Sequence, residues 1–390
     1  FDTQSSFNFQ NQVKLEYTPT EDDIIQKIEV GNISMPVKNS LILGAQSLFG
    51  VKTKLKFGRL TMTTVLSQDK GQKSEIETKN NSVVIDPLPS WVEGDTKTAI
   101  IKFVNDITND GGSKYIHPNE RIATFDNDGT LWCEQPVAQL EFVSYQINKM
   151  ANSNPGWKDQ QPYKSILEGD KNYLINDYIN NHGKELMKLI SITHSGITLE
   201  RFNSDVEEFI NSSMHPKYNK KYTETVYQPM IELIQYLQNN DFKTYICSGG
   251  GNDFMRVFAE ETYGIVPENV IGTFAMNSFE QIDGSWQIVK GNNIFFMNDG
   301  LTKPAAIEQR IGRVPIFVAG NVRSGGDIGQ LTYSNTNKLP NFQLLVNHDD
   351  DIREFAYSEK DSASLKAAVI GKWQVVSMKD DWLTIFPFEK

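Results

Sequence analysis

Asp126 and Asp128 stand one residue apart, directly after the apolar run Ile122–Phe125. A strand that ends at this point aims side chains and backbone carbonyls at one place above a sheet, where two carboxylates repel each other. Such a pair attracts a divalent cation, and one carboxylate can attack phosphorus while the other moves a proton. A bare Asp-x-Asp also describes a solvated acidic turn. The longer run Asp-Asn-Asp-Gly-Thr-Leu-Trp after a strand favours the chemical interpretation.

Ser248 opens a run of three glycines that begins with Gly249, after a strand predicted over residues 244–247 and before a helix predicted over 253–263. Such a turn leaves backbone N–H groups and a hydroxyl free to hold phosphate oxygens. The alternative is an ordinary tight turn. Arg256, one turn into the helix, has two open roles: contact with a substrate anion, or a surface salt bridge.

Two further motifs follow. Lys303 and Pro304 begin a predicted helix, and proline suits a first helical turn; a lone lysine is ordinarily solvated surface. A glycine-rich loop with Asn321 and Asp327 follows the strand predicted over residues 315–319. Asp327 is the only carboxylate of that loop, and an asparagine amide ligates Mg²⁺ more weakly than a carboxylate. Which of the two residues contacts an ion therefore stays open.

The order strand–Asp, strand–Ser, Lys, strand–Asp resembles the haloacid-dehalogenase (HAD) superfamily of aspartate-nucleophile hydrolases. The resemblance covers about residues 86–390, and other segments extend it toward bacterial phosphatases distantly similar to phosphoserine phosphatases. These segments are residues 86–91, 132–136, 226–230 and 378–382.

The resemblance implies that Asp126 is the nucleophile and that Asp128 protonates the leaving alcohol and then activates water. Lys303 would neutralise the charge, and Ser248 with the Gly249 amide would bind the transferring phosphoryl group.

As metal, the resemblance implies Mg²⁺ held by Asp126, the Asp128 backbone carbonyl and Asp327. Asn321 takes the usual first acidic position of the last motif, in a loop about two residues longer than usual. Glu134, just past the first motif, either points into a cleft to contact substrate or caps a helix.

The pattern of apolar and polar residues changes near Asp86. Before it, apolar and polar residues alternate, as in 13–17 and 54–57, and a period of two predicts strands with one apolar face. Residues 58–59 suit a hairpin turn, and 68–81 are polar and suggest a linker. About residues 1–80 resemble a small part of the outer-membrane translocon barrel of gliding motility and type IX secretion.

After residue 86, strands alternate with helices, which predicts an α/β fold: a Rossmann-like parallel sheet with helices on both faces. Helical patterns at 140–150, 183–192, 199–210 and 228–237 fill the long interval between the Asp and Ser motifs. We therefore expect a HAD core at 86–133 and 223–390 with a helical cap at about 134–222, preceded by a β-rich segment and linker over 1–85.

The composition of the chain argues against some classes of function. A net charge of -11 argues against a nucleic-acid partner but not against a small phosphorylated substrate. No apolar run approaches the roughly 18 residues that a transmembrane helix needs. We expect the two cysteines, Cys133 and Cys247, to be packed core residues. The five histidines share no metal-ligand spacing, so we expect scaffold or surface roles.

Because the chain begins at Phe1, we expect a fragment or a processed product. The compartment stays open between cytoplasm and periplasm. Two alternatives remain for function. A haloacid dehalogenase needs no metal and would leave Asp128 and Asp327 without a role. A non-enzymatic fragment of an outer-membrane secretion or gliding assembly, fused to a HAD domain, would account for residues 1–80.

Overall fold

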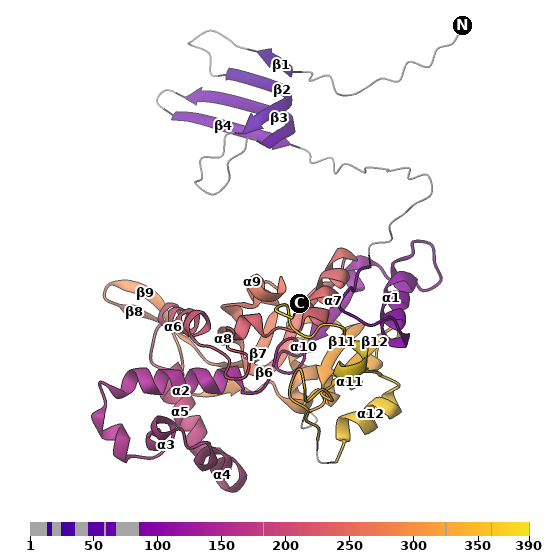
Figure 1. Ribbon diagram of the computed structural model, residues 1–390. Helices are drawn as coiled ribbons and strands as arrows, with labels where there is room; N and C mark the ends of the chain where they lie inside the picture. Colours follow the sequence, from indigo (N-terminus) through magenta and orange to yellow (C-terminus); the bar gives the residue numbers. More distant parts are fainter. Residues whose placement is uncertain are drawn as a thin grey trace. The chain divides into compact units, whose positions relative to one another are not determined.

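The computed structural model describes residues 14–17, 25–35, 46–57, 60–67 and 86–390, except 182, 324–325, 360 and 390. The chain divides into two compact units, Phe1–Val84 and Ile85–Lys390 (Figure 1). The turn predicted at 58–59 and the linker predicted at 68–81 lie outside the described residues.

The first unit contains a four-stranded antiparallel sheet in the order β1-β2-β3-β4. Its strands are β1 Lys14–Tyr17, β2 Ile25–Met35, β3 Gln46–Phe57 and β4 Leu60–Ser67. Along the end of β3, Leu55 is half-buried while Lys54 and Lys56 are exposed. Alternation along a strand puts neighbours on opposite faces, so the period of two correctly predicted strands here.

The second unit is built on a seven-stranded sheet in the order β10-β7-β6-β5-β11-β12-β13. Only the β10–β7 pair is antiparallel. The strands are β5 Ile122–Phe125, β6 Lys243–Gly251, β7 Val270–Ala275, β10 Ile294–Phe296, β11 Phe317–Asn321, β12 Phe342–Asn347 and β13 Gln374–Ser377. The predicted α/β class with a mostly parallel sheet is therefore confirmed.

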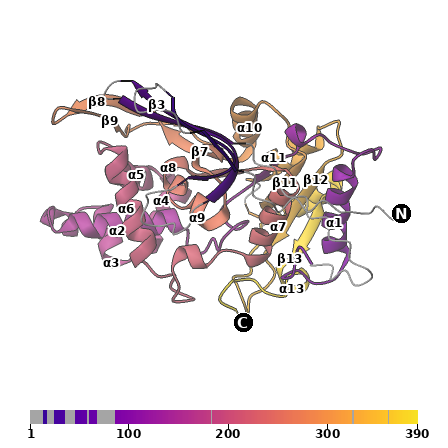
Figure 2. The same cartoon turned by 90° about the horizontal axis from the view of Figure 1, so that it is seen from above.

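Apolar clusters cover both faces of this sheet. Successive strand residues point to opposite faces, and in β12 Leu344 and Val346 belong to the largest cluster while Leu345 belongs to another. Figure 2 shows α7 and α10 on different sides of the strands. The helices of this part are α1 Asp95–Thr108, α7 Gln228–Asn239, α8 Asn252–Arg256, α9 Ala259–Tyr263, α10 Lys303–Ile311, α11 Ile328–Asn335, α12 Ala363–Gly371 and α13 Met378–Asp381.

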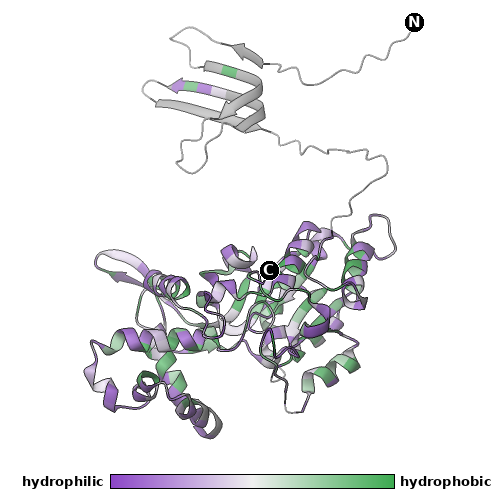
Figure 3. Ribbon diagram, in the orientation of Figure 1, coloured by the Kyte–Doolittle hydropathy of each residue, from purple (hydrophilic) through white to green (hydrophobic). Residues whose placement is uncertain are grey.

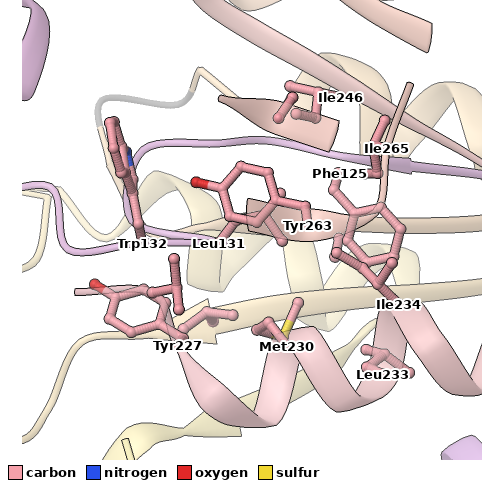
Figure 4. Packing of buried hydrophobic residues seen from close by; sticks show 14 of the residues in the cluster. Phe125, Leu131, Trp132, Tyr227, Met230, Leu233, Ile234, Ile246, Tyr263 and Ile265 are labelled. Atoms are coloured by element: carbon pink, nitrogen blue, oxygen red, sulfur yellow. The ribbon is translucent and has the colours of Figure 1, made fainter. Parts of the chain in front are cut away.

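The largest cluster joins the sheet to α7 (Figure 4). Phe125 and Ile246 come from adjacent strands, and Met230, Leu233 and Ile234 come from the helix, all nearly inaccessible to solvent. The hydropathy colouring agrees, with green concentrated on the strands and purple on outward-facing helix surfaces (Figure 3). Because β5 is buried on both faces, its C-terminal end is held in a fixed position, from which Asp126 follows.

A helical insert separates β5 from β6. It contains α2 Ala138–Ala151, α3 Tyr163–Glu168, α4 Lys171–Asn181, α5 Lys184–His194 and α6 Leu199–Ser212. Part of it has a separate apolar cluster, which includes Ile147 and Leu189. The helical patterns predicted at 140–150, 183–192 and 199–210 match α2, α5 and α6, whereas α3 and α4 were not predicted.

A β-hairpin, β8 Ser278–Ile282 and β9 Ser285–Val289, packs beside α6 (Figure 1). Lys290 donates its backbone N–H to the Ile197 carbonyl at 2.9 Å, which ties the hairpin to the insert. The sequence pattern of residues 264–299 did not predict these strands. Asp283 and Gly284 both have positive φ, so the Asp-Gly pair was a usable signal for a tight hairpin turn.

Two predicted boundaries were wrong. The strand predicted to end at Cys247 continues to Gly251, which pairs with Thr273 of β7. The helix predicted over 253–263 is two short helices, α8 and α9. Within the described part of the chain, no helix is both long and apolar enough to span a membrane.

Candidate active site

The Asp, Ser and second Asp motifs lie on three neighbouring parallel strands, β6, β5 and β11. Carboxyl ends of parallel strands meet at one edge of a sheet. Asp126 follows β5, Ser248 lies near the end of β6, and Asp327 follows β11. All three line one cavity of about 760 Å³, together with Asp128, Gly249 and Lys303. The structure thus brings these six residues together in one cavity.

Lys303 connects two of these motifs. It is the first residue of α10, and its ammonium donates to Asp126 Oδ1 at 2.8 Å and to Asp327 Oδ1 at 2.6 Å. The Lys303 side chain is only 3% exposed. A buried charge is stable only when it is paired, so this lysine is not the solvated surface residue that a lone lysine usually is.

Burial and repulsion shift the protonation of the site. Burial, with the Asp327 charge second, raises the pKa of Asp126 despite the opposing effect of Lys303. Burial also raises the pKa of Asp128. For Lys303 burial acts to lower the pKa, but Asp126 and Asp327 outweigh it, so the ammonium stays charged. The site therefore holds a fixed cation between carboxyl groups that are reluctant to ionise together.

A tight turn holds Asp128. Trp132 donates its indole N–H to Asp128 Oδ1 at 2.9 Å, and the backbone N–H of Gly129 bonds the Trp132 carbonyl at 3.0 Å. Gly129 has φ +75°, and a Cβ there would overlap the amide of Asn321. Glycine tolerates positive φ without strain. Glycine at residue 129 is therefore favoured by backbone shape and by the closeness of Asn321 at the end of β11.

Asp327 is fixed by hydrogen bonds as well as by Lys303. Its Oδ2 accepts the backbone N–H of Asn321 at 2.8 Å, and its Oδ1 accepts from Gln330 Nε2 at 2.8 Å. A Cβ at Gly320 would lie 2.6 Å from the Asp327 carboxyl group. Of the two candidate ligands in this loop, Asp327 is the one that contacts Lys303.

The glycines after Ser248 belong to an extended strand end. Ser248 Oγ accepts the Gly250 N–H at 3.1 Å, and Gln139 Oε1 of α2 accepts the Gly251 N–H at 2.8 Å. A Cβ at Gly250 would overlap the Gln139 side chain. Close approach of the Gln139 side chain from α2 therefore favours glycine at residue 250.

Glu134 points into the cavity. It pairs with Arg323, and the Tyr357 hydroxyl donates to Glu134 Oε2 at 2.7 Å. Burial raises the pKa of Glu134 to about 7, against the lowering effect of Arg323. Of the two roles left open for Glu134, helix capping is not supported, since α2 has no side-chain cap. Arg323 and Tyr357 were not predicted as site residues, because neither belongs to a recognisable sequence motif.

A buried pair, His348 and Glu354, packs against the turn that holds Asp128. His348 Nε2 lies 2.7 Å from the Gly129 carbonyl, and His348 Nδ1 lies 3.2 Å from Glu354 Oε2. Glu354 also accepts from Cys133 Sγ at 3.1 Å and from the Tyr227 hydroxyl at 3.2 Å. These contacts agree with a scaffold role for His348 and a packed role for Cys133. Glu354 was not predicted, because its partners come from distant segments.

Other predicted residues lie apart from the chemistry. Arg256 donates to the Pro267 carbonyl at 3.0 Å and lies 3.7 Å from Asp253, outside the cavity lining. Its role as a substrate contact is therefore not supported. Cys247 is buried and free, and His215 is buried with Nε2 2.8 Å from the Gln135 carbonyl. His182 lies outside the described residues.

The oxygen donors at this edge of the sheet are of the kind that can hold a metal ion. Among the residues that the structure describes, no group of three or more His, Cys, Asp or Glu side chains has the arrangement of a metal site. The carboxyl groups of Asp126 and Asp327 nevertheless meet at one ammonium. Among the described residues that line the cavity, six have carboxyl groups and three are lysine or arginine. This hard-oxygen, acidic donor set fits Mg²⁺ in type and charge.

Solved structures show partial likeness. A conserved protein of unknown function from Anaerococcus prevotii has TM-score 0.47 and 15% identity, over 72% of this chain and 91% of that one. A phosphoserine phosphohydrolase-like protein from Francisella tularensis has TM-score 0.36 and 18% identity, over 66% and 94%. Cytosolic 5'-nucleotidase IIIB bound to cytidine has TM-score 0.38 and 12% identity, over 74% and 90%. These TM-scores are too low to carry an assignment.

A search of curated proteins found no match. A profile of the SprA_N family, described as motility related/secretion protein, matches residues 1–232. The match agrees with the translocon resemblance of residues 1–80, and it extends through β5, Asp126, Asp128 and the helical insert. Since the match covers more than half of the sequence, the chain belongs to the SprA_N family of motility-related and secretion proteins.

Proposed function

We propose that residues 86–390 hydrolyse phosphate monoesters through an aspartyl-phosphate. The observation that carries the proposal is the buried Lys303 ammonium, which bonds both Asp126 and Asp327 in the cavity that Ser248 also lines. A fixed cation beside a carboxylate nucleophile is what phosphoryl transfer between anions requires.

In the proposed first step, a carboxylate oxygen of Asp126 attacks phosphorus. The new O–P bond forms as the bond from phosphorus to the alcohol oxygen breaks, and Asp128 gives its proton to that oxygen. A raised pKa suits Asp128 to this task, because a carboxylic acid must hold its proton until it is needed.

In the second step, water attacks phosphorus and loses a proton to Asp128. The bond from phosphorus to Asp126 breaks, which restores the carboxylate and releases inorganic phosphate. Lys303, Ser248 and the Gly249 amide hold the phosphoryl oxygens through both steps.

We propose that Mg²⁺ is held by Asp126, Asp327 and the Asp128 backbone carbonyl. The ion would supply positive charge that offsets repulsion between an acidic cavity and a phosphate dianion. The excess of carboxyl groups in the lining supports this assignment. Without such charge the anionic ester would be repelled by Asp126 and Asp327 before reaching the nucleophile.

The helical insert, residues 134–222, is proposed as a cap over a core formed by 86–133 and 223–390. Gln139, Leu140 and Met187 of the insert line the same cavity as Asp126, so the insert can exclude water and select the alcohol. Haloacid dehalogenase activity fits this site less well than phosphatase activity, because dehalogenation would use neither the Asp128 carboxyl group nor Asp327.

The proposal is tested with p-nitrophenyl phosphate and the Asp126→Asn variant. The substitution keeps shape but removes the nucleophilic charge, so we expect kcat to fall at least about 10³-fold with Mg²⁺ present. Asp106→Asn, an exposed-pair residue on α1, serves as the matched control and should retain activity. Undiminished turnover by Asp126→Asn would exclude this nucleophile.

A second proposal concerns the first unit. The SprA_N match supports a role for residues 1–84 in a motility or secretion assembly, with the hydrolase domain attached to it. If both halves form one native protein, a tryptic digest of the native source must contain the peptide from Asn80 to Lys97. Recovery of peptides from both halves without this junction, despite adequate coverage of a synthetic standard, would contradict the fusion.

A further inference from the structure

The cavity is much larger than a phosphoryl group requires. Its volume of about 760 Å³ falls within the roughly 300–1,000 Å³ of sites that hold drug-sized ligands. The lining reaches from β11 across β5, β6 and β7 to β10, the edge strand. Four strand spacings correspond to roughly 19 Å, so the cavity accepts a long molecule.

Several lining residues that do not contact Lys303 have large apolar side chains. These side chains come from α2, α5, β7, β10 and the segment that follows β10. We call this set the apolar channel, and it consists of Leu140, Met187, Ile190, Phe274, Ile294 and Met297.

Within the described part of the chain, the two basic side chains beside the apolar channel, Lys290 and His194, are not available to a second anionic group. Lys290 pairs with Asp253, and its ammonium lies 4.2 Å from the centre of the Phe202 ring. Burial lowers the pKa of His194 to about 3, so that imidazole is neutral. Lys290 and Asp253 therefore compensate each other within the protein, and the lining offers a ligand uncharged polar groups, such as Asn292 and Ser195, and apolar contact.

The apolar channel continues to the surface. Leu140 is 39% exposed and Met297 is 53% exposed. Beyond the cavity, Phe295 is 63% exposed and its ring lies 5.7 Å from that of Phe274. Contiguous exposed apolar side chains mark a binding surface, and here the surface leads into the cavity that contains Lys303.

We propose that the substrate is the phosphate monoester of an alcohol with a long, unbranched apolar chain. Resting on the proposed phosphatase function, this inference replaces the expected small metabolite with an amphiphile. The phosphate lies between Asp126, Ser248 and Lys303, and the chain lies along the apolar channel toward Met297. Each methylene buried there adds to binding.

The test measures kcat/KM for n-alkyl phosphates from ethyl to decyl, below micelle formation, with the full chain and Mg²⁺. We expect kcat/KM to rise about two- to fourfold for each methylene until the channel is filled. Hydrolysis of ethyl phosphate with no gain along the series, or a preference for nucleoside monophosphates, would overturn the inference and leave the phosphatase proposal standing. Hydrolysis of no phosphate ester would overturn both.

A matched pair of variants locates the effect. Leu140→Gln replaces a partly exposed channel residue, so the fold should tolerate it, and the decyl-to-ethyl ratio of kcat/KM should fall roughly fivefold to tenfold. Leu383→Gln alters an exposed leucine outside the cavity and should leave that ratio unchanged. Equal ratios in Leu140→Gln and Leu383→Gln would contradict binding in the apolar channel.

Discussion

Lys303 holds together a site that would otherwise be a set of repelling acids. Its two bonds, to Asp126 and Asp327, are shielded from solvent, so neither is weakened as an exposed pair would be. The same lysine therefore has two consequences, one for stability and one for catalysis, and these can be separated by substitution.

Lys303→Met should destabilise the fold by about 3–5 kcal/mol, since it leaves buried carboxyl groups without their cation. The double variant Lys303→Met/Asp327→Asn removes one of those carboxylates and should recover part of this loss while activity stays absent. Urea unfolding of the single and double variants measures the coupling. Additive losses would show that Lys303 and Asp327 do not interact.

Glu134 gives the molecule a pH-dependent stability. Its pKa is about 7 in the fold because of burial, against an ordinary value of 4.5. Between these values the folded chain keeps a proton that the unfolded chain has lost. The free energy of unfolding should therefore fall as pH rises from about 4.5 to about 7.

Glu134→Gln lacks this titration. The difference in unfolding free energy, wild type minus variant, should decline across that window and be flat above it, as measured by chemical denaturation at several pH values. A difference that grows with rising pH would mean that Arg323 stabilises the Glu134 carboxylate more than burial opposes it.

Sequence alone anticipated the residues that carry a motif, and the structure gathers them in one cavity; their catalytic roles remain predictions. Asp126, Ser248 and Lys303 were recognisable because each follows or begins an element in a fixed order. His348, Glu354 and Tyr357 were not recognisable as partners, since only the folded chain brings them to residues 129, 133 and 134.

The elements were predictable where one period dominated. β5 and α7 have clear apolar patterns, whereas β8 and β9 carry mostly exposed residues, so burial left no pattern to detect. The extension of β6 to Gly251 depends on pairing with β7, which is a long-range contact. Local sequence favoured a turn there because glycines are common in turns.

Substitutions of Gly129, in the turn after β5, test whether backbone conformation or the approach of β11 selects glycine there. Gly129→Ala combines positive φ with overlap of the Asn321 amide, while Gly111 has similar φ, +79°, and open space around its Cβ position. Gly111→Ala should cost about 1 kcal/mol, and Gly129→Ala clearly more, about 3 kcal/mol or above. Thermal unfolding of both variants compares them. Equal losses would mean that backbone strain alone, and not the approach of β11, selects glycine at residue 129.

Within the described residues, every apolar cluster of the molecule begins at or after Leu88. Trp91 packs edge-on against Trp382, with ring centres 5.9 Å apart, and donates its indole N–H to the Pro229 carbonyl at 2.9 Å. These contacts close the second unit by joining its first residues to its last, so its stability should be contained in residues 85–390.

A chain limited to residues 85–390 should therefore keep the thermal midpoint of its unit, while one limited to 95–390 loses Trp91 and about 3–5 kcal/mol. Differential scanning calorimetry of the two truncated chains and the full chain makes the comparison. A midpoint for 85–390 well below that of the corresponding transition in the full chain would show that the first unit stabilises the second.

The proposed hydrolysis passes through a covalent bond between Asp126 and phosphorus. Borohydride reduces an acyl phosphate to an alcohol, so quenching turnover with it and sequencing peptides by mass spectrometry tests that bond directly. We predict that residue 126 is recovered as homoserine when substrate and Mg²⁺ are present, and as aspartate when substrate is omitted. Intact aspartate at residue 126, under conditions where phosphate is being released and a known acyl phosphate is fully reduced, would contradict the proposed aspartyl-phosphate mechanism.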